Sequence, residues 1–278
     1  MPAVISATQF KITPLPLTTV AQKKSQIAGG EGFQMVMAIA YAPSDPSIVY
    51  MGSDTSQVWK SFDSGRSWHI INNDYIAQGT RSLFVHPNNS DLVFSAGSHG
   101  KWYKPEKHIS GYQGIYRSDD GGMNWKMVQE VPFFKQESRG NLFAIDSRTM
   151  GSAKFTIYAG TYDGDLLVST DGGFTWQKTS FKTGPILEIV ESPKTRGTML
   201  VASENGLFRF DGKNATQIGE GLPTWPRSIA VSKDKPDVVY AALGKHGVFK
   251  SMDDGRHFEQ CQRGSVWSVI NDVEVSPV

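Results

Sequence analysis

Short apolar segments alternate with turn residues along most of the chain. The first four segments, at 36–43, 47–53, 57–62 and 67–72, are rich in Val, Ile, Tyr and Ala, and Pro, Asn, Asp or Gly separate them. Short runs of β-branched and aromatic residues between turn formers predict β-strands. The same four-segment pattern returns in copies that begin near residues 81, 142, 186 and 227. Since four antiparallel strands make one propeller blade, we predict an all-β propeller with five complete blades.

A short string recurs in each copy, between the third and the fourth segment. Its frame is Ser-x-Asp-x-Gly-x-(Thr/Ser/Asn)-Trp, and a period of 40 to 57 residues between its aspartates is typical of propellers. The Asp side chain can accept backbone N–H groups within a turn, and Gly supplies a positive φ. We therefore expect a structural role for these aspartates. They are Asp63, Asp120, Asp171 and Asp253, with a degenerate copy at Asp211.

The two ends of the chain fit the repeat less well. Residues 1–30 are expected to form an N-terminal extension, and 31–278 the propeller. Residues 265–278 resemble the first strand of a blade, as 223–232 do, so a sixth blade is expected to start there. A closed propeller usually needs more blades or a strand that completes the last one. We therefore expect part of a seven-bladed propeller, truncated at its C-terminus; the alternative is a five-bladed ring closed by the tail.

The charge and composition of the chain argue against several classes of function. Lys and Arg number 28 and Asp and Glu 27, without a run of one sign, which argues against a nucleic-acid or membrane surface. No signal-peptide pattern and no membrane-spanning stretch is visible. The single cysteine, Cys261, excludes an internal disulfide and is expected to pack in a strand. The histidines show no metal-ligand spacing, and no phosphate-binding glycine loop precedes a helix, so no metal and no cofactor is expected.

Function is expected on the loops opposite the repeated aspartate turns. In a four-stranded meander, the loops between the second and third strands and between blades lie on that face, and functional residues favour loops on a rigid scaffold. These loops gather acids and aromatic rings that could contact a polysaccharide or oligosaccharide. Packing is the competing interpretation for each aromatic residue. The candidates are Trp59, Trp102, Tyr103, Tyr112, Tyr162, Asp163, Trp225 and Trp267.

Two resemblances follow from these motifs. The repeated string resembles the Asp-box, or BNR repeat, of sialidases, sortilins and several glycosidase families. The stretch 29–68 resembles the opening of glycoside hydrolase family 74, the xyloglucanases, and the likeness continues to residue 125. The resemblance implies two seven-bladed propellers that face each other across a cleft, with one catalytic Asp from each. Asp54 matches the first, which implies the general base of an inverting hydrolase acting on a β-glucan, outside the cell or in the periplasm.

One departure keeps a second interpretation open. Family members follow this Asp with a Gly-Gly pair, whereas this chain has Thr55, Ser56 and Gln57. Inverting hydrolysis needs two carboxyl groups about 6.5–9.5 Å apart, and the second would come from another propeller. Asp54 could equally be a strand-end aspartate that accepts backbone N–H groups. The alternative function is a non-catalytic protein-interaction propeller, as in sortilin-like receptors or photosystem assembly factors.

Overall fold

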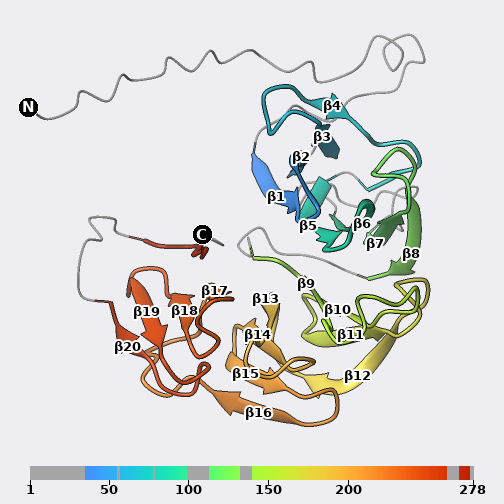
Figure 1. Ribbon diagram of the computed structural model, residues 1–278. Helices are drawn as coiled ribbons and strands as arrows, with labels where there is room; N and C mark the ends of the chain where they lie inside the picture. The colour runs from blue at the N-terminus through green and yellow to red at the C-terminus, as the bar shows by residue number, and fades with distance from the viewer. Residues whose placement is uncertain are drawn as a thin grey trace, which may run out of the picture.

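The predicted fold class is confirmed. The computed structural model describes residues 35–54, 57–77, 79–98, 113–131, 140–261 and 269–275. Within these ranges the chain is all-β, and its strands form five four-stranded sheets, each one a blade of a β-propeller (Figure 1). No helix in the described part of the chain is long and apolar enough to cross a membrane.

The first two blades follow the expected segments closely. In each, consecutive strands pair antiparallel in sequence order, so each blade is a simple meander. Blade 1 consists of β1 (Val36–Ala42), β2 (Asp45–Ser53), β3 (Val58–Ser61) and β4 (His69–Ile70), and blade 2 of β5 (Gly79–His86), β6 (Asn89–Ser98), β7 (Gly114–Ser118) and β8 (Lys126–Glu130).

The last three blades repeat this topology, and their first two strands are shorter than those of blades 1 and 2. Blade 3 contains β9 (Phe143–Ile145), β10 (Ile157–Gly160), β11 (Asp165–Ser169) and β12 (Gln177–Lys182). Blade 4 contains β13 (Ile186–Glu191), β14 (Met199–Ser203), β15 (Gly206–Phe210) and β16 (Ala215–Ile218). Blade 5 contains β17 (Ser228–Val231), β18 (Val239–Ala242), β19 (Val248–Ser251) and β20 (Glu259–Gln260).

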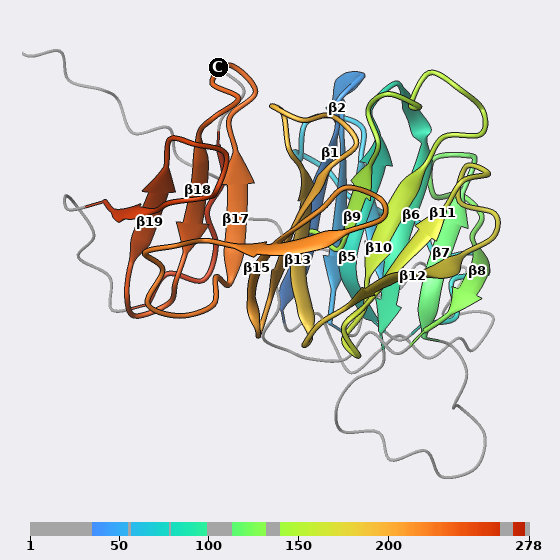
Figure 2. The same cartoon turned by 90° about the horizontal axis from the view of Figure 1, so that it is seen from below.

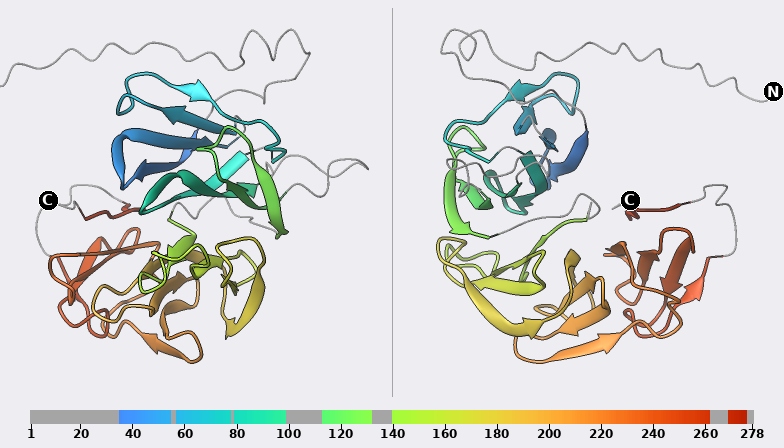
Figure 3. Two further views of the ribbon diagram at one scale, coloured as in Figure 1. Left: turned by 45° about the vertical axis from the view of Figure 1, so that its right-hand side comes forward. Right: turned by 180° about the vertical axis from the view of Figure 1, so that it is seen from behind.

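The blades are arranged around a common centre, with β1, β5, β9, β13 and β17 as the innermost strands (Figure 1). Blades 1 and 5 stand at the two ends of this arc, and the segment 269–275 lies between them (Figures 1 and 3). In that segment Ile270 forms an isolated antiparallel bridge with Gly244, rather than the expected full strand.

The apolar core lies between neighbouring blades. Tyr50 of blade 1 and Tyr116 of blade 2, both fully buried, belong to the cluster between those blades. Phe94 and Phe143 belong to the corresponding cluster between blades 2 and 3, and their ring centroids are 6.2 Å apart. Each such side chain contributes about 1.5–3 kcal/mol when buried. Because both sheet faces of an inner blade are covered, its strands read as nearly continuous apolar runs, as β14 does.

The repeated string forms the turn between the third and fourth strands of its blade. In blade 3 the Asp171 carboxylate accepts hydrogen bonds from Ser169 Oγ (2.7 Å), from the backbone N–H of Thr175 (3.0 Å) and from Thr175 Oγ1 (2.6 Å). Gly172 and Gly173 adopt φ of 84° and 91°, which explains why glycine is used here. Burial alone would raise the pKa of Asp171, but the hydrogen bonds outweigh it and lower the pKa to about 2. Asp63, Asp120 and Asp253 accept equivalent bonds.

Candidate functional site

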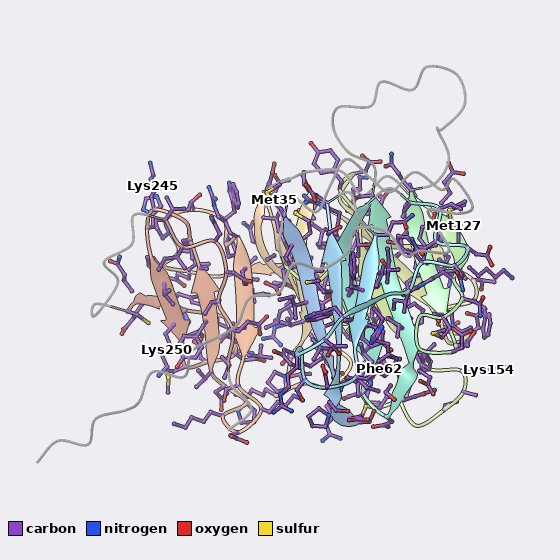
Figure 4. All side chains as sticks on the ribbon, turned by 90° about the horizontal axis from the view of Figure 1, so that it is seen from above. Met35, Phe62, Met127, Lys154, Lys245 and Lys250 are labelled. Atoms are coloured by element: carbon purple, nitrogen blue, oxygen red, sulfur yellow. The ribbon has the colours of Figure 1, made fainter. Side chains whose placement is uncertain are left out.

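The strands run between two distinct ends of the propeller (Figure 2). Phe62, in a repeated aspartate turn, and Lys154 lie toward one end, while Met35 and Lys245 lie toward the other (Figure 4). We call the end where Met35 and Lys245 lie the loop end. It carries the connections between the second and third strands of each blade and the connections between blades. Asp54 belongs to the loop end, because it follows β2 directly and pairs with Met35.

Asp54 is held by the start of blade 1. Its backbone N–H donates to the carbonyl of Met35 at 3.1 Å, and its Oδ1 accepts the N–H of Met35 at 3.2 Å. The side chain is half-exposed. The start of blade 2 passes equally close, since a Cβ on Gly79 would lie 2.0 Å from the Asp54 carbonyl oxygen. A half-exposed carboxylate is therefore fixed where the inner strands of two blades begin.

Gln57 occupies a strained position beside Asp54. Its φ is 65°, in the left-handed region that costs an L-residue roughly 1–2 kcal/mol. Its Nε2 donates to the carbonyls of Tyr75 (2.8 Å) and Ala77 (3.2 Å), and Asn72 donates to its Oε1. These bonds tie the β2–β3 loop to the connection that enters blade 2. Gln57 thus adopts a conformation that suits glycine, in the stretch where the family 74 resemblance expects a Gly-Gly pair; Thr55 and Ser56 lie outside the described residues.

A buried carboxyl group links three successive blades near the centre. Glu188, on β13 of blade 4, is only 3% exposed. It accepts the backbone N–H of Asn141 before blade 3 (3.2 Å) and of Ile229 in blade 5 (2.7 Å). Burial raises the pKa of Glu188 to about 8, although the N–H donors act in the opposite direction. The sequence signals this residue only by the position of Glu188 between apolar neighbours in the segment ILEIVE, and it is not among the residues predicted above.

The polar chain extends from Glu188 on both sides. Toward blade 2, Ser82 Oγ donates to the Asn141 side chain at 3.2 Å. Toward the C-terminal segment, Ser228 Oγ donates to Asp272 at 2.7 Å, and Arg227 donates to Asn271 at 2.6 Å. These hydrogen bonds connect the innermost layer of blades 2 to 5 with residues 269–275. They hold the inner strands of neighbouring blades together beneath the loops of the loop end.

Two expectations are corrected by the structure. Trp59 does not face a ligand surface, because it is only 1% exposed on the central strand β3, where the indole is enclosed by the protein. Cys261 is not packed in a strand but exposed, just after β20. Its backbone N–H donates to the carbonyl of Val248, so the strand edge is fixed by the backbone while the thiol faces solvent.

The remaining candidates are dispersed over the loop end. Asp163 is exposed and Tyr162 half-buried in the β10–β11 turn of blade 3. Trp225 is half-buried before blade 5, and the Arg227 guanidinium carbon lies 5.7 Å from its ring centroid. No group of three or more His, Cys, Asp or Glu side chains in the described ranges is arranged to hold a metal ion. Four candidates lie outside the described residues: Trp102, Tyr103, Tyr112 and Trp267.

No family model matches the sequence, and no curated protein matches it either. The fold, however, is similar to solved propellers. An ancestral GH74 enzyme superposes over 89% of this chain with a TM-score of 0.65 at 21% identity. The GH74 enzyme of Niastella koreensis covers 82% of this chain (TM-score 0.63, 19% identity), and the GH74 xyloglucanase of Xanthomonas campestris covers 84% (TM-score 0.59, 14% identity). The match spans only 34%, 38% and 46% of those chains, so this chain is similar in fold to a part of each GH74 enzyme.

Proposed function

We propose that this chain is a carbohydrate-active propeller that binds a β-glucan such as xyloglucan at its loop end. The observation that carries the proposal is the fold similarity to three GH74 enzymes, one of them a xyloglucanase, over more than four fifths of the chain. The loop end supplies groups suited to a glycan. Asp54 offers a fixed carboxylate oxygen for sugar hydroxyls, and half-buried aromatic rings offer apolar faces.

The surroundings of Asp54 support a role for it as a general base. Its carboxylate is half-exposed, and one of its oxygens is oriented by the Met35 N–H. As a general base it would accept a proton from the attacking water, while a second carboxyl group on the other side of the glycosidic bond donates one to the leaving oxygen. We propose that this second group comes from a second propeller, as the family 74 resemblance implies. This chain then contributes one half of the catalytic pair and part of the glycan cleft.

Binding of xyloglucan oligosaccharides, measured by isothermal titration calorimetry, tests the proposal. We expect Asp54→Ala to weaken binding by about tenfold, because a charged hydrogen-bond acceptor is lost. Asp234→Ala is the matched control, since Asp234 is exposed between β17 and β18, at the opposite end of the blade. Equal affinity in the Asp54 and Asp234 variants, or no binding of any β-glucan by the folded chain, would contradict the proposal.

One observation favours the alternative, an interaction propeller. Exposed large apolar side chains gather along the innermost strand of blade 1, where Ile39 is 59% and Tyr41 65% exposed. Apolar surface of this kind is common at protein interfaces. If the surface joins two copies of the chain, sedimentation velocity should show a dimer that Ile39→Ser and Tyr41→Ser dissociate. A monomer at all concentrations removes this support.

A further inference from the structure

A cavity separates the outer parts of blades 2 and 3. Its volume is about 210 Å³. One wall is the end of β8, with Gln129 and Glu130, and the other consists of the β10–β11 turn and the start of β12, with Asp163, Trp176 and Lys178. The cavity is smaller than the roughly 300–1,000 Å³ typical of drug-sized ligands, so it suits a ligand of about one ring.

Trp176 makes the apolar wall because of how it sits in its blade. The corresponding residue of blade 2, Trp125, is 4% exposed, and its indole N–H donates to the Ile71 carbonyl of the preceding blade at 2.9 Å. The indole N–H of Trp176 instead donates to Gly173 in its own turn, at 3.1 Å, and the ring stays half-buried. Phe94 meets it nearly edge-on, with centroids 6.4 Å apart and planes at 82°. The indole is therefore a fixed, partly accessible platform.

The polar wall has a defined charge pattern. Asp165 is paired with both Lys178 (2.6 Å) and Lys182 (2.7 Å), so its charge is already balanced. Glu130 and Asp163 are exposed carboxylates at the same cavity. These two carboxylates would repel an anion. A cation could use the carboxylates but not the N–H donors of Lys178. A neutral ligand rich in hydroxyl groups can use both kinds of group, because it can donate to the carboxylates and accept from the Lys178 ammonium.

We propose that this cavity binds one neutral pyranose ring of a glycan, with the apolar face of the ring on Trp176 and its hydroxyls on Glu130 and Asp163. The combination of one aromatic face with several fixed polar groups is what orients a small ligand in a protein pocket. The inference shares only the ligand class with the proposed function and does not use Asp54. It places a second sugar-binding position on the side of the propeller, between two blades.

The test is a titration of the chain, labelled with ¹⁵N at its tryptophan indoles, with methyl β-D-glucopyranoside and cellobiose. The Trp176 signal is assigned with Trp176→Phe. We expect this signal to shift and saturate with the neutral sugars but not with glucuronate or choline. Asp163→Ala and Glu130→Ala should each raise the half-saturating concentration by about tenfold, and Asp234→Ala should leave it unchanged.

Three results of the titrations would overturn the proposal, and the Asp54→Ala variant provides a fourth. They are the absence of a saturable shift at Trp176 with either sugar, a stronger response to choline or glucuronate, and unchanged affinity in both Asp163→Ala and Glu130→Ala. Asp54→Ala separates the two sites. If the Trp176 response survives in this variant, the cavity is independent of the proposed function, whichever way the xyloglucan experiment turns out. If the response is lost in a folded Asp54→Ala protein, the cavity is not a separate site and the proposal fails.

Discussion

The Glu188 carboxyl group of blade 4 accepts the backbone N–H of Ile229 in blade 5 at 2.7 Å, and the same side chain accepts the N–H of Asn141 before blade 3. One buried acid therefore satisfies backbone donors from both neighbouring blades. Such donors would otherwise be left unpaired where the inner strands meet, which costs about 1–3 kcal/mol each. The bond pattern favours a carboxyl group here over an apolar side chain of similar size.

The stability of the fold should depend on pH through Glu188. Its pKa is about 8 in the folded protein, against an ordinary value of 4.5. As the pH rises from about 4.5 to about 8, the unfolded chain releases a proton that the folded chain keeps, so the free energy of unfolding falls across this window and then levels off. Urea unfolding at a series of pH values should show this slope in the wild type and a flatter one in Glu188→Gln.

The Gln variant also tests the hydrogen bonds. Its amide nitrogen cannot accept a backbone N–H, so we expect Glu188→Gln to cost about 1–3 kcal/mol at the acid end of the window, where the wild-type side chain is protonated. A Gln variant with the same pH slope as the wild type would show that another group is responsible.

The repeated aspartates should contribute to stability in the opposite pH range. We expect Asp171→Ala to lower the free energy of unfolding by about 1–2 kcal/mol at neutral pH, because the turn loses its acceptor for Thr175 and Ser169. The folded pKa of Asp171 is about 2 against an ordinary 3.8. This contribution is therefore complete above about 3.8 and disappears as the pH falls toward 2. Asp234→Ala, at an exposed turn position, should change stability little. Thermal melts of both variants and the wild type, at neutral pH and near pH 2, measure these differences in stability.

The sequence predicts the blades well because their signals are local. Each segment carries its own turn formers and β-branched residues, so the predicted segments 36–43 and 47–53 match β1 and β2 to within two residues. The exposure of single aromatic residues could not be read in this way. Trp59 precedes a repeated turn and is enclosed by the protein. Trp176 ends a repeated turn and borders a cavity whose other wall comes from blade 2. Glu188 was missed for the same reason, because its partners lie 41 and 47 residues away.

Because the backbone at Gln57 is strained, we predict that substitution by Ala destabilises the protein more than substitution by Gly does. Gln57→Ala keeps the positive φ of 65° and loses the three hydrogen bonds of the side chain, whereas Gln57→Gly loses the same bonds but relieves the strain. We expect the Ala variant to be less stable than the Gly variant by about 1 kcal/mol. At Gly151, where an added Cβ has no atom within 4 Å, Ala should be at least as stable as Gly. An Ala variant at least as stable as the Gly variant at position 57 would show that the loop relaxes to an ordinary φ.

Two of the equivalent tryptophans, Trp125 and Trp176, should differ in what they contribute to folding. Trp125→Ala should cost about 3–5 kcal/mol, because it empties a buried site between blades 1 and 2 and leaves the Ile71 carbonyl unpaired. Trp176→Ala should cost roughly half as much, because this ring is half-exposed and its N–H partner lies in its own turn. Urea unfolding of both variants measures the difference. If the Trp176 variant is as destabilised as the Trp125 variant, the indole stabilises the packing between blades. The cavity beside it would then be a packing defect. A smaller loss leaves the ring available as a surface for a ligand, since its exposed face then contributes little to holding the blades together.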